Sequence, residues 1–231
     1  MRLNSPHLFH AQTGVVKFNI RARAGVDYLV KAGLLSQSPG AIARFLFAHE
    51  LSDGTKCDDL NRQRIGEYLG TLGASEEARM FHRELLTGFM ALFSFGGLSV
   101  VGALRLLLTR FRLPGEAQII DRLMQCFADS YMRDNCAIGL HSDVIYVLSF
   151  AAIMLNTDLH NPRVLKKMTL QQFKSSLLSV DAPAVVVEDI FRDIAAFPIA
   201  LDLDCDVVTF FAPAKVGVDR GIFSAFLAHG E

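Results

Sequence analysis

The sequence predicts an all-α fold of eight to ten helices. Apolar residues recur at spacings of three and four along most of the chain, which is the period of a helix with one buried face. Helix-start signals such as Ser38-Pro39 and the capping box from Thr169 to Gln172 precede these runs. No long stretch alternates between apolar and polar residues, and 207–211 is the only strand candidate.

The first half of the chain shows two well-marked helices. Ser38-Pro39 is followed at helical spacing by Ile42, Phe45 and Leu46. Ser75 with two glutamates opens the other, because acids favour the positive end of the helix dipole. Its apolar face consists of Phe81, Leu85 and Phe89.

The second half continues the same pattern after a Pro-Gly corner at residues 114–115. Four helices are expected here, at about 117–131, at 144–155, from Thr169 and after Pro183. The first of them has an apolar stripe made of Ile120, Leu123, Met124, Phe127 and Tyr131. The last has one made of Val186, Val187, Ile190, Phe191 and Ile194.

Composition indicates a globular protein of a reducing compartment. The 231 residues are 51% hydrophobic and 20% charged, and the net charge is −1, without the basic excess of nucleic-acid-binding proteins. No signal peptide is evident at the start. The scattered cysteines form no CxxC pair, which favours free thiols in the cytosol. They are Cys57, Cys126, Cys136 and Cys205.

One stretch raises the possibility of a membrane span. Leu85–Leu104 is twenty residues long and has no formal charge, and about 20 residues cross a bilayer. It also contains Phe95-Gly-Gly-Leu-Ser99, a sequence typical of a helix end followed by a new start. Two helices joined by a tight turn are the preferred interpretation.

Metal and cofactor sites find no support in the sequence. Asp202, Asp204 and Asp206 resemble the opening of a calcium loop, but valine stands at the glycine position and proline at the final glutamate position. His7 and His10 lack further ligands for zinc. Because no phosphate-binding loop, dinucleotide fingerprint or nucleophile elbow occurs, we expect no metal, no cofactor and no covalent catalysis.

Two segments separated by about 30 residues carry the functional signal. In Phe111–Arg122, Pro114 and Gly115 present Glu116 where a helix should start, a place where an acid is also an ordinary stabilising residue. In Tyr146–Pro162, an apolar helix ends at Asn161-Pro162. Tyr146, Phe150, Ile153 and Met154 form one stripe on this helix. The stripe is either plain core or an exposed groove that a partner covers.

Both segments closely resemble the two motifs of the Sec-seven family, the exchange factors of Arf-type GTPases. The resemblance extends over residues 18–197 and rests on further matches. These are Phe18-Asn19, Gly25, Tyr28-Leu29, Leu34-Leu35, Ile65–Gly70 and Ala103–Arg105. The family fold implied is an all-α, right-handed superhelix of about ten helices. The implied activity is release of GDP from an Arf GTPase, without covalent chemistry and without a cofactor.

The resemblance also implies a role for each motif residue. Glu116 matches the glutamic finger that enters the nucleotide site, repels the β-phosphate, displaces Mg²⁺ and holds the P-loop lysine. Tyr146, Phe150, Ile153 and Met154 match the groove that receives the apolar switch regions. Asn161 matches the polar residue at the end of that groove. In this family brefeldin A traps the complex with the GTPase. The positions that determine sensitivity are Phe150, Ala151, Asp158 and Met168, two of resistant and two of sensitive type.

The chain departs from the family pattern at two places and at its end. The loop 48–62 is longer than usual, and 90–99 is more apolar. We expect a leader at 1–17, the exchange domain at 18–200 and a linker-like tail at 201–231. The tail resembles the entry into a pleckstrin-homology domain of cytohesin-like members, so we expect a fragment or a tail that folds back. Phe210-Phe211 would then either compete with the GTPase in the groove or pack on the last helix.

Three functions compete at this point. The first is an exchange factor that regulates vesicle traffic, cytoplasmic and recruited peripherally through flanking regions to Golgi, endosomal or plasma membranes. The second is a scaffold that binds an Arf protein without exchange, which would not need Glu116. The third is a membrane-embedded helical protein that depends on Leu85–Leu104.

Overall fold

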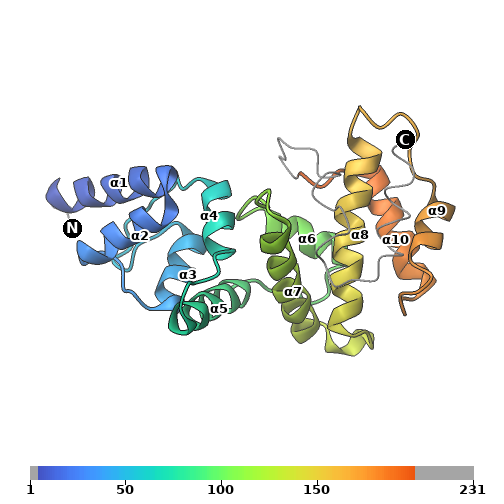
Figure 1. Cartoon of the computed structure of the whole chain (residues 1–231), viewed down its shortest axis with the longest axis horizontal. Coiled ribbons are helices and arrows are strands. Elements are labelled where there is room, and N and C mark those ends of the chain that lie inside the picture. The colour runs from blue at the N-terminus through green and yellow to red at the C-terminus, as the bar shows by residue number, and fades with distance from the viewer. Residues whose placement is uncertain (1–4, 201–231) are drawn as a thin grey trace. The chain divides into compact units, whose positions relative to one another are not determined.

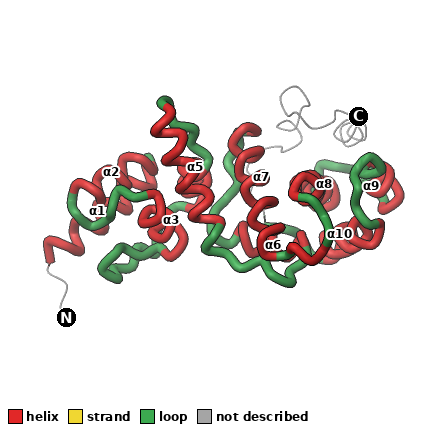
Figure 2. Tube along the Cα trace, turned by 90° about the horizontal axis from the view of Figure 1, so that it is seen from below, coloured by secondary structure: helices red, strands yellow, loops and turns green. Residues whose placement is uncertain are grey.

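The computed structural model describes residues 5–200, and regular structure in this range is entirely helical (Figure 1). It contains ten α-helices and one short 3₁₀ helix, η1, with no strand among the described residues (Figure 2). The all-α class with about ten helices is confirmed. The strand candidate 207–211 and the acidic triplet at 202–206 lie outside the described residues.

The N-terminal unit comprises residues 5–94 and takes in 110–114. Helix α1 packs on α2, α2 on α4, α3 on α5 and α4 on α5. Its fully buried side chains include Phe18, Leu29, Ile42, Phe45, Ile65 and Phe89. Its helices are α1 (Ser5–Ile20), α2 (Ala22–Lys31), α3 (Pro39–Ala48), α4 (Arg62–Leu69) and α5 (Glu76–Met90).

The C-terminal unit comprises 95–109 and the described residues from 115 onward. Helix α8 packs on α6, α7 and α10, and α9 packs on α10. This arrangement places α8 at the centre of the unit. The helices are α6 (Val100–Leu108), α7 (Ala117–Asp134), η1 (Cys136–Ile138), α8 (Ser142–His160), α9 (Leu170–Ser176) and α10 (Ala184–Ala196).

Helix α1 occupies residues that the sequence had assigned to a leader. It begins at Ser5, and Ala11, Val15 and Phe18 are buried at helical spacing against α2. The expected boundary after residue 17 therefore falls inside a helix. The periodicity escaped notice because apolar residues also occupy a second, exposed side of this helix.

Side-chain caps mark the helix starts that the sequence predicted. Ser38 accepts a hydrogen bond from the N–H of Ala41, with Pro39 at the first helical position. Ser75 caps α5 in the same way. Thr169 and Gln172 form the expected capping box of α9. Each cap satisfies backbone donors that have no partner inside the helix.

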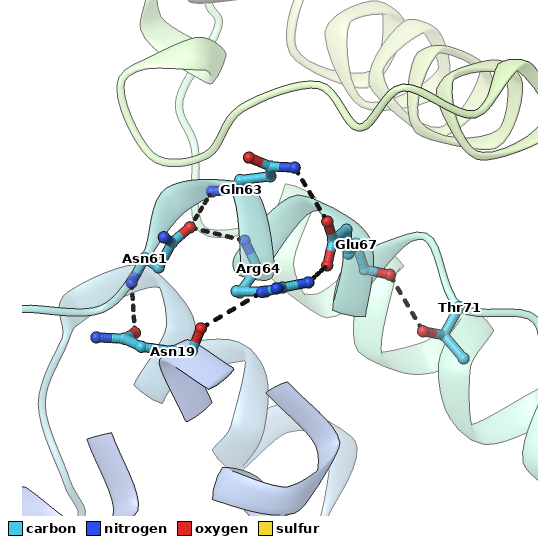
Figure 3. Close-up of polar contacts among 6 residues, drawn as sticks. All are labelled: Asn19, Asn61, Gln63, Arg64, Glu67 and Thr71. Carbon is cyan, nitrogen blue, oxygen red and sulfur yellow. Dashed lines mark hydrogen bonds and ion pairs between the residues drawn. The ribbon is translucent and has the colours of Figure 1, made fainter. Parts of the chain in front are cut away.

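A polar network ties the end of α1 to the start of α4 (Figure 3). The Asn19 amide accepts from the N–H of Asn61 at 2.8 Å and donates to the carbonyl of Asp59 at 2.7 Å. Asn61 in turn caps α4, because its side-chain oxygen accepts from the N–H groups of Gln63 and Arg64. The C-terminal end of α1 is thereby fixed against the start of α4 within the N-terminal unit.

The uncharged stretch Leu85–Leu104 is not one helix, so the preferred interpretation of two helices is confirmed and the alternative of a membrane span there is wrong. Helix α5 ends at Met90 and α6 begins at Val100, as the turn interpretation predicted. Within the intervening segment, the N–H of Phe95 donates to Asp134 and the N–H of Gly97 donates to Asn135, each at 2.9 Å. The end of α7 therefore holds this turn in place.

Helix α8 is the one described helix that is long and apolar enough to cross a membrane by length and composition alone. Of its apolar window, 61% is buried inside the structure. The core helix of a globular protein satisfies the same two criteria, and the central position of α8 in its unit agrees with that interpretation.

We expect Gly25→Ala to lower the free energy of unfolding by about 1–3 kcal/mol, because α1 and α2 approach too closely for a side chain there. A Cβ at Gly25 would lie 2.4 Å from the Phe18 Cα. Urea denaturation would measure the change. The control is Gly88→Ala, whose Cβ would meet Ala43 at an ordinary 3.7 Å and should stabilise α5 by about 0.5–1 kcal/mol. Equal effects of the two variants would contradict the close-approach argument.

Candidate functional site

Glu116 stands immediately before α7 with an exposed side chain. Its backbone is extended (φ −101°, ψ 120°), and its carbonyl accepts from the N–H groups of Ile119 and Ile120. The carboxylate makes no capping hydrogen bond. Because the backbone is fixed by the helix start while the carboxylate has no capping role, the acid is presented to solvent from a rigid position.

The position of Glu116 depends on the packing of α7. The predicted apolar stripe of this helix is buried, and it lies on the helix that packs against α8. At the far end of α7, Asp134 accepts the Phe95 N–H. The Arg133 side chain and this N–H hold the pKa of Asp134 below its usual value. The buried stripe and the Asp134 contact thus anchor α7 within the C-terminal unit.

The predicted stripe on α8 is present but covered. Phe150 and Ile153 are each 1% exposed, Tyr146 7% and Met154 8%. The rings of Tyr146 and Phe150 meet edge to face with centroids 4.9 Å apart. The residues alone left plain core and an exposed groove open, and the family resemblance implied the groove, whereas these side chains are buried in this structure. Their use by a partner therefore stays a prediction.

Tyr146 links the stripe to α7 through a hydrogen bond. Its hydroxyl donates to the carboxylate of Asp121, one turn after the start of α7. Burial, followed by this hydrogen bond and the negative charge of Asp121, raises the pKa of Tyr146 well above its usual value. The phenol therefore remains protonated and keeps donating, which fixes the register of α8 against α7.

The end of α8 is held by a compact polar turn. Asn161 follows the last helical residue, is half-buried, and accepts the N–H of Arg163 at 3.0 Å. The Lys167 ammonium donates to the carbonyls of Asp158 and Asn161 at 2.8 and 2.6 Å. The Asp158 carboxylate accepts the N–H of Met168 at 2.7 Å. Lysine at this place neutralises the negative end of the helix dipole.

The predicted inhibitor positions fall into two pairs. Phe150 and Ala151 are adjacent and buried on α8. Asp158 and Met168 lie ten residues apart in the sequence but are joined by the hydrogen bond just described. The structure thus brings the second pair together, which sequence spacing did not reveal.

A buried amide that was not predicted from the sequence connects α8 to the segment after α10. Asn156 is 5% exposed, and its side chain donates to the carbonyl of Ile199 at 3.1 Å and accepts the Ile199 N–H at 2.6 Å. Nearby, the Arg105 guanidinium pairs with Asp193 at 2.6 Å. The available signal was a single asparagine inside an apolar helix, which must find a partner when buried.

The described part of the chain shows no cluster of metal ligands, and its buried cysteine is a protonated thiol. No group of three or more His, Cys, Asp or Glu side chains within 5–200 could hold a metal ion. His7 instead pairs with Asp53 at 2.7 Å, and His10 bonds the Tyr28 hydroxyl. Cys57 is free, and burial raises the pKa of its thiol to about 11. It is therefore protonated and unreactive at neutral pH.

The N-terminal unit has a surface pocket of about 760 Å³ that involves none of the predicted site residues. Its lining includes Val26, Ile42, Tyr68 and Phe81. Burial raises the pKa of Tyr68 to about 12. The pocket is separate in the chain from Glu116 and the α8 stripe, and nothing in it indicates catalysis.

Comparison with known proteins identifies close relatives. The model of the Sec7 domain matches residues 9–199, beginning inside α1. Cytohesin-2 of Mus musculus is 39% identical over 211 residues, which cover 88% of this chain and 49% of that protein. The protein secG of Dictyostelium discoideum, which contains ankyrin repeats with PH and SEC7 domains, is 34% identical over 84% of this chain and 19% of that protein. The chain spans about half the length of the cytohesins it matches.

Solved structures show the same likeness. A Sec7 domain bound to ARF1-GDP and complexed with brefeldin A has a TM-score of 0.72 and 34% identity. The match covers 85% of this chain and 95% of that one. The Sec7p catalytic domain has a TM-score of 0.68 and 32% identity, covering 86% of this chain and 98% of that one.

We expect Asn156→Leu to lower the free energy of unfolding by about 2–4 kcal/mol, because the buried N–H and carbonyl of Ile199 would both lose their partner. Urea denaturation followed by circular dichroism would measure this change. Ser149→Ala is the control on the same helix, since the Ser149 hydroxyl bonds only a carbonyl of its own helix. A loss as small as that of the control would contradict the assigned role of Asn156.

Proposed function

The chain belongs to the Sec7 domain family, as its motifs predicted, and on this premise we propose that it is a guanine-nucleotide exchange factor of an Arf-family GTPase. It would bind the GDP-loaded GTPase and speed release of the nucleotide, without covalent chemistry of its own. The observation that supports this most is the likeness to a Sec7 domain that has been solved bound to ARF1-GDP.

Glu116 is the proposed catalytic group. Its exposed carboxylate, presented at the start of α7 and free of any capping bond, suits insertion into a nucleotide site on another protein. There it would repel the β-phosphate of GDP, displace Mg²⁺ and pair with the P-loop lysine. Two like charges about 4 Å apart repel by about 4 kcal/mol at an effective dielectric near 20. That energy corresponds to about three decades in nucleotide affinity.

The α8 stripe is the proposed receiver of the apolar switch regions of the GTPase. Tyr146, Phe150, Ile153 and Met154 lie on one side of the helix, and Asn161 ends it with a polar group. These four apolar side chains are buried in this structure. Docking therefore requires the groups that cover them to move aside, so we expect binding to include a conformational step.

The cellular setting follows from the same proposal. An exchange factor for Arf proteins would work in the cytoplasm and be recruited peripherally to Golgi, endosomal or plasma membranes, where it would regulate vesicle traffic. Brefeldin A would act through the positions of Phe150, Ala151, Asp158 and Met168. Of these, Phe150 and Ala151 are buried on α8, and Asp158 accepts the N–H of Met168.

We expect Glu116→Lys to reduce the rate of GDP release from an Arf protein by about three decades, because the charge that repels phosphate becomes one that attracts it. Release of a fluorescent GDP analogue would be measured at fixed GTPase concentration. Glu77→Lys is the control, an exposed acid in the first turn of α5 with the same charge change. Exchange at the wild-type rate by Glu116→Lys would show that the assigned mechanism is wrong. Binding without exchange by the wild type would favour the scaffold.

We expect Met154→Ala to weaken binding of the GTPase by about 2 kcal/mol or more and to lower stability by about 2–5 kcal/mol. Both quantities are needed, since Met154 is buried in the free chain. The control is Leu148→Ala, a fully buried leucine on another side of α8, which should lower stability alone. If both variants bound the GTPase with wild-type affinity, the α8 stripe would be plain core.

A further inference from the structure

Helix α1 has a second apolar face that nothing in the described structure covers. Its first face, with Ala11, Val15 and Phe18, is buried against α2. On another side, Phe9 is 63% exposed, Val16 59% and Ile20 70%. Three large apolar side chains at such exposure on one short helix are costly in water, which points to an interaction surface.

These three residues lie on one side of the helix. With 3.6 residues per turn they lie within about 40° of one another, and the stripe extends for about 16 Å. The other residues near this side, Gln12 and Thr13, are uncharged, and the Thr13 hydroxyl is satisfied by the Phe9 carbonyl at 2.8 Å. No charged group therefore interrupts the stripe, which we call the α1 stripe.

The charged residues of α1 and of the turn after it are all cations, and the acids nearest to α1 belong to the loop 51–60 and to α2. Asp53 pairs with His7, and the carbonyl of Asp59 accepts from Asn19. The first 26 residues of the chain contain four cations, Arg2, Lys17, Arg21 and Arg23, and no aspartate or glutamate, although the whole chain has a net charge of −1. Lys17, Arg21 and Arg23 are exposed. The Arg23 Nε lies 3.8 Å from a carboxylate oxygen of Asp27, which is on the same helix. Lys17 and Arg21 take part in no ion pair within residues 5–200.

We propose that α1 docks on an anionic lipid bilayer. The helix would lie in the plane of the membrane, with Phe9, Val16 and Ile20 inserted among the acyl chains. Lys17 and Arg21 would lie at the level of the phosphate and carboxylate groups. Exposed aromatic and branched apolar residues on one side, with exposed cations beside them, are the features of such interfacial helices.

Two observations favour a bilayer over another occupant. A second copy of the chain would bring the same cations against each other, and like charges across an interface are unfavourable. In addition, the stripe is already formed, because the Asn19 network holds the end of α1 and His10 bonds the Tyr28 hydroxyl at 2.6 Å. A preformed stripe avoids the ordering cost that helices folding on the membrane must overcome.

The test is flotation of the full chain with vesicles of phosphatidylcholine, with or without phosphatidylserine. We expect binding to the phosphatidylserine vesicles that weakens as salt is raised. Val16→Asp combined with Ile20→Asp should reduce the bound fraction at least about tenfold, since it removes apolar contact and adds two negative charges near an anionic surface. The matched control is Leu165→Asp combined with Leu178→Asp, two exposed leucines of the C-terminal unit, which should bind as wild type.

Three results would overturn the proposal. One is a wild-type chain that does not float with phosphatidylserine vesicles. Another is undiminished flotation of the Val16→Asp, Ile20→Asp variant, which would place the contact elsewhere. The third is a dimer, seen by analytical ultracentrifugation of the wild type, that this variant dissociates. The melting temperature of the variant should equal that of the wild type, which shows that a loss of flotation is not caused by unfolding. Because no GTPase is present, these outcomes are independent of the proposed exchange activity.

Discussion

Burial of α8 is the constraint on which the C-terminal unit depends. Eleven of its nineteen residues are buried, and the helix is apolar on nearly every side, so it must be enclosed by other elements. Helices α6, α7 and α10 provide this enclosure. The few polar groups within it are satisfied locally or by a single partner, as the Ser149 hydroxyl and the Asn156 amide show. An unsatisfied polar group at this depth would cost more than a hydrogen bond contributes.

The enclosure of α8 also determines where Glu116 stands. Helix α7 is oriented by its own apolar stripe, and the Tyr146–Asp121 hydrogen bond ties its first turns to α8. At the start of α7 a serine, threonine, aspartate or asparagine would contribute about 0.5–2 kcal/mol as a cap. Glu116 makes no such bond, and neither do the residues before α2, α8 and α10, whereas the starts of α3, α4, α5, α6 and α9 all have one. The missing cap leaves the Glu116 carboxylate exposed, and its role in exchange rests on the match to the family motif.

Local chemistry was predictable from the sequence, and the environment of each element was not. The starts of α3, α5 and α9 were predicted correctly because a cap involves only residues within one turn. The two family motifs were enough to predict the fold of the Sec7 family. Helix α1 was missed because its two apolar faces obscure the helical period. The stripe on α8 was assigned correctly to one side of a helix, but periodicity cannot tell what covers that side. The contact between Asn156 and Ile199 joins residues 43 apart, beyond the reach of any local pattern.

A near-zero net charge conceals a strong separation of charge along this chain. The first 26 residues contain only cations among their charged groups, although acids slightly outnumber bases overall. The net charge of −1 indicates that the chain has no uniformly basic surface for nucleic acid. It does not describe the local charge of one helix with an apolar stripe. Electrostatic attraction to a membrane falls off within a Debye length, about 8–10 Å at physiological salt. The charge that matters for α1 is therefore the charge within that distance of its stripe, and there Lys17 and Arg21 lack acidic partners among the described residues. Local charge and exposed apolar area, rather than the sum over 231 residues, decide which surface this chain offers to a bilayer.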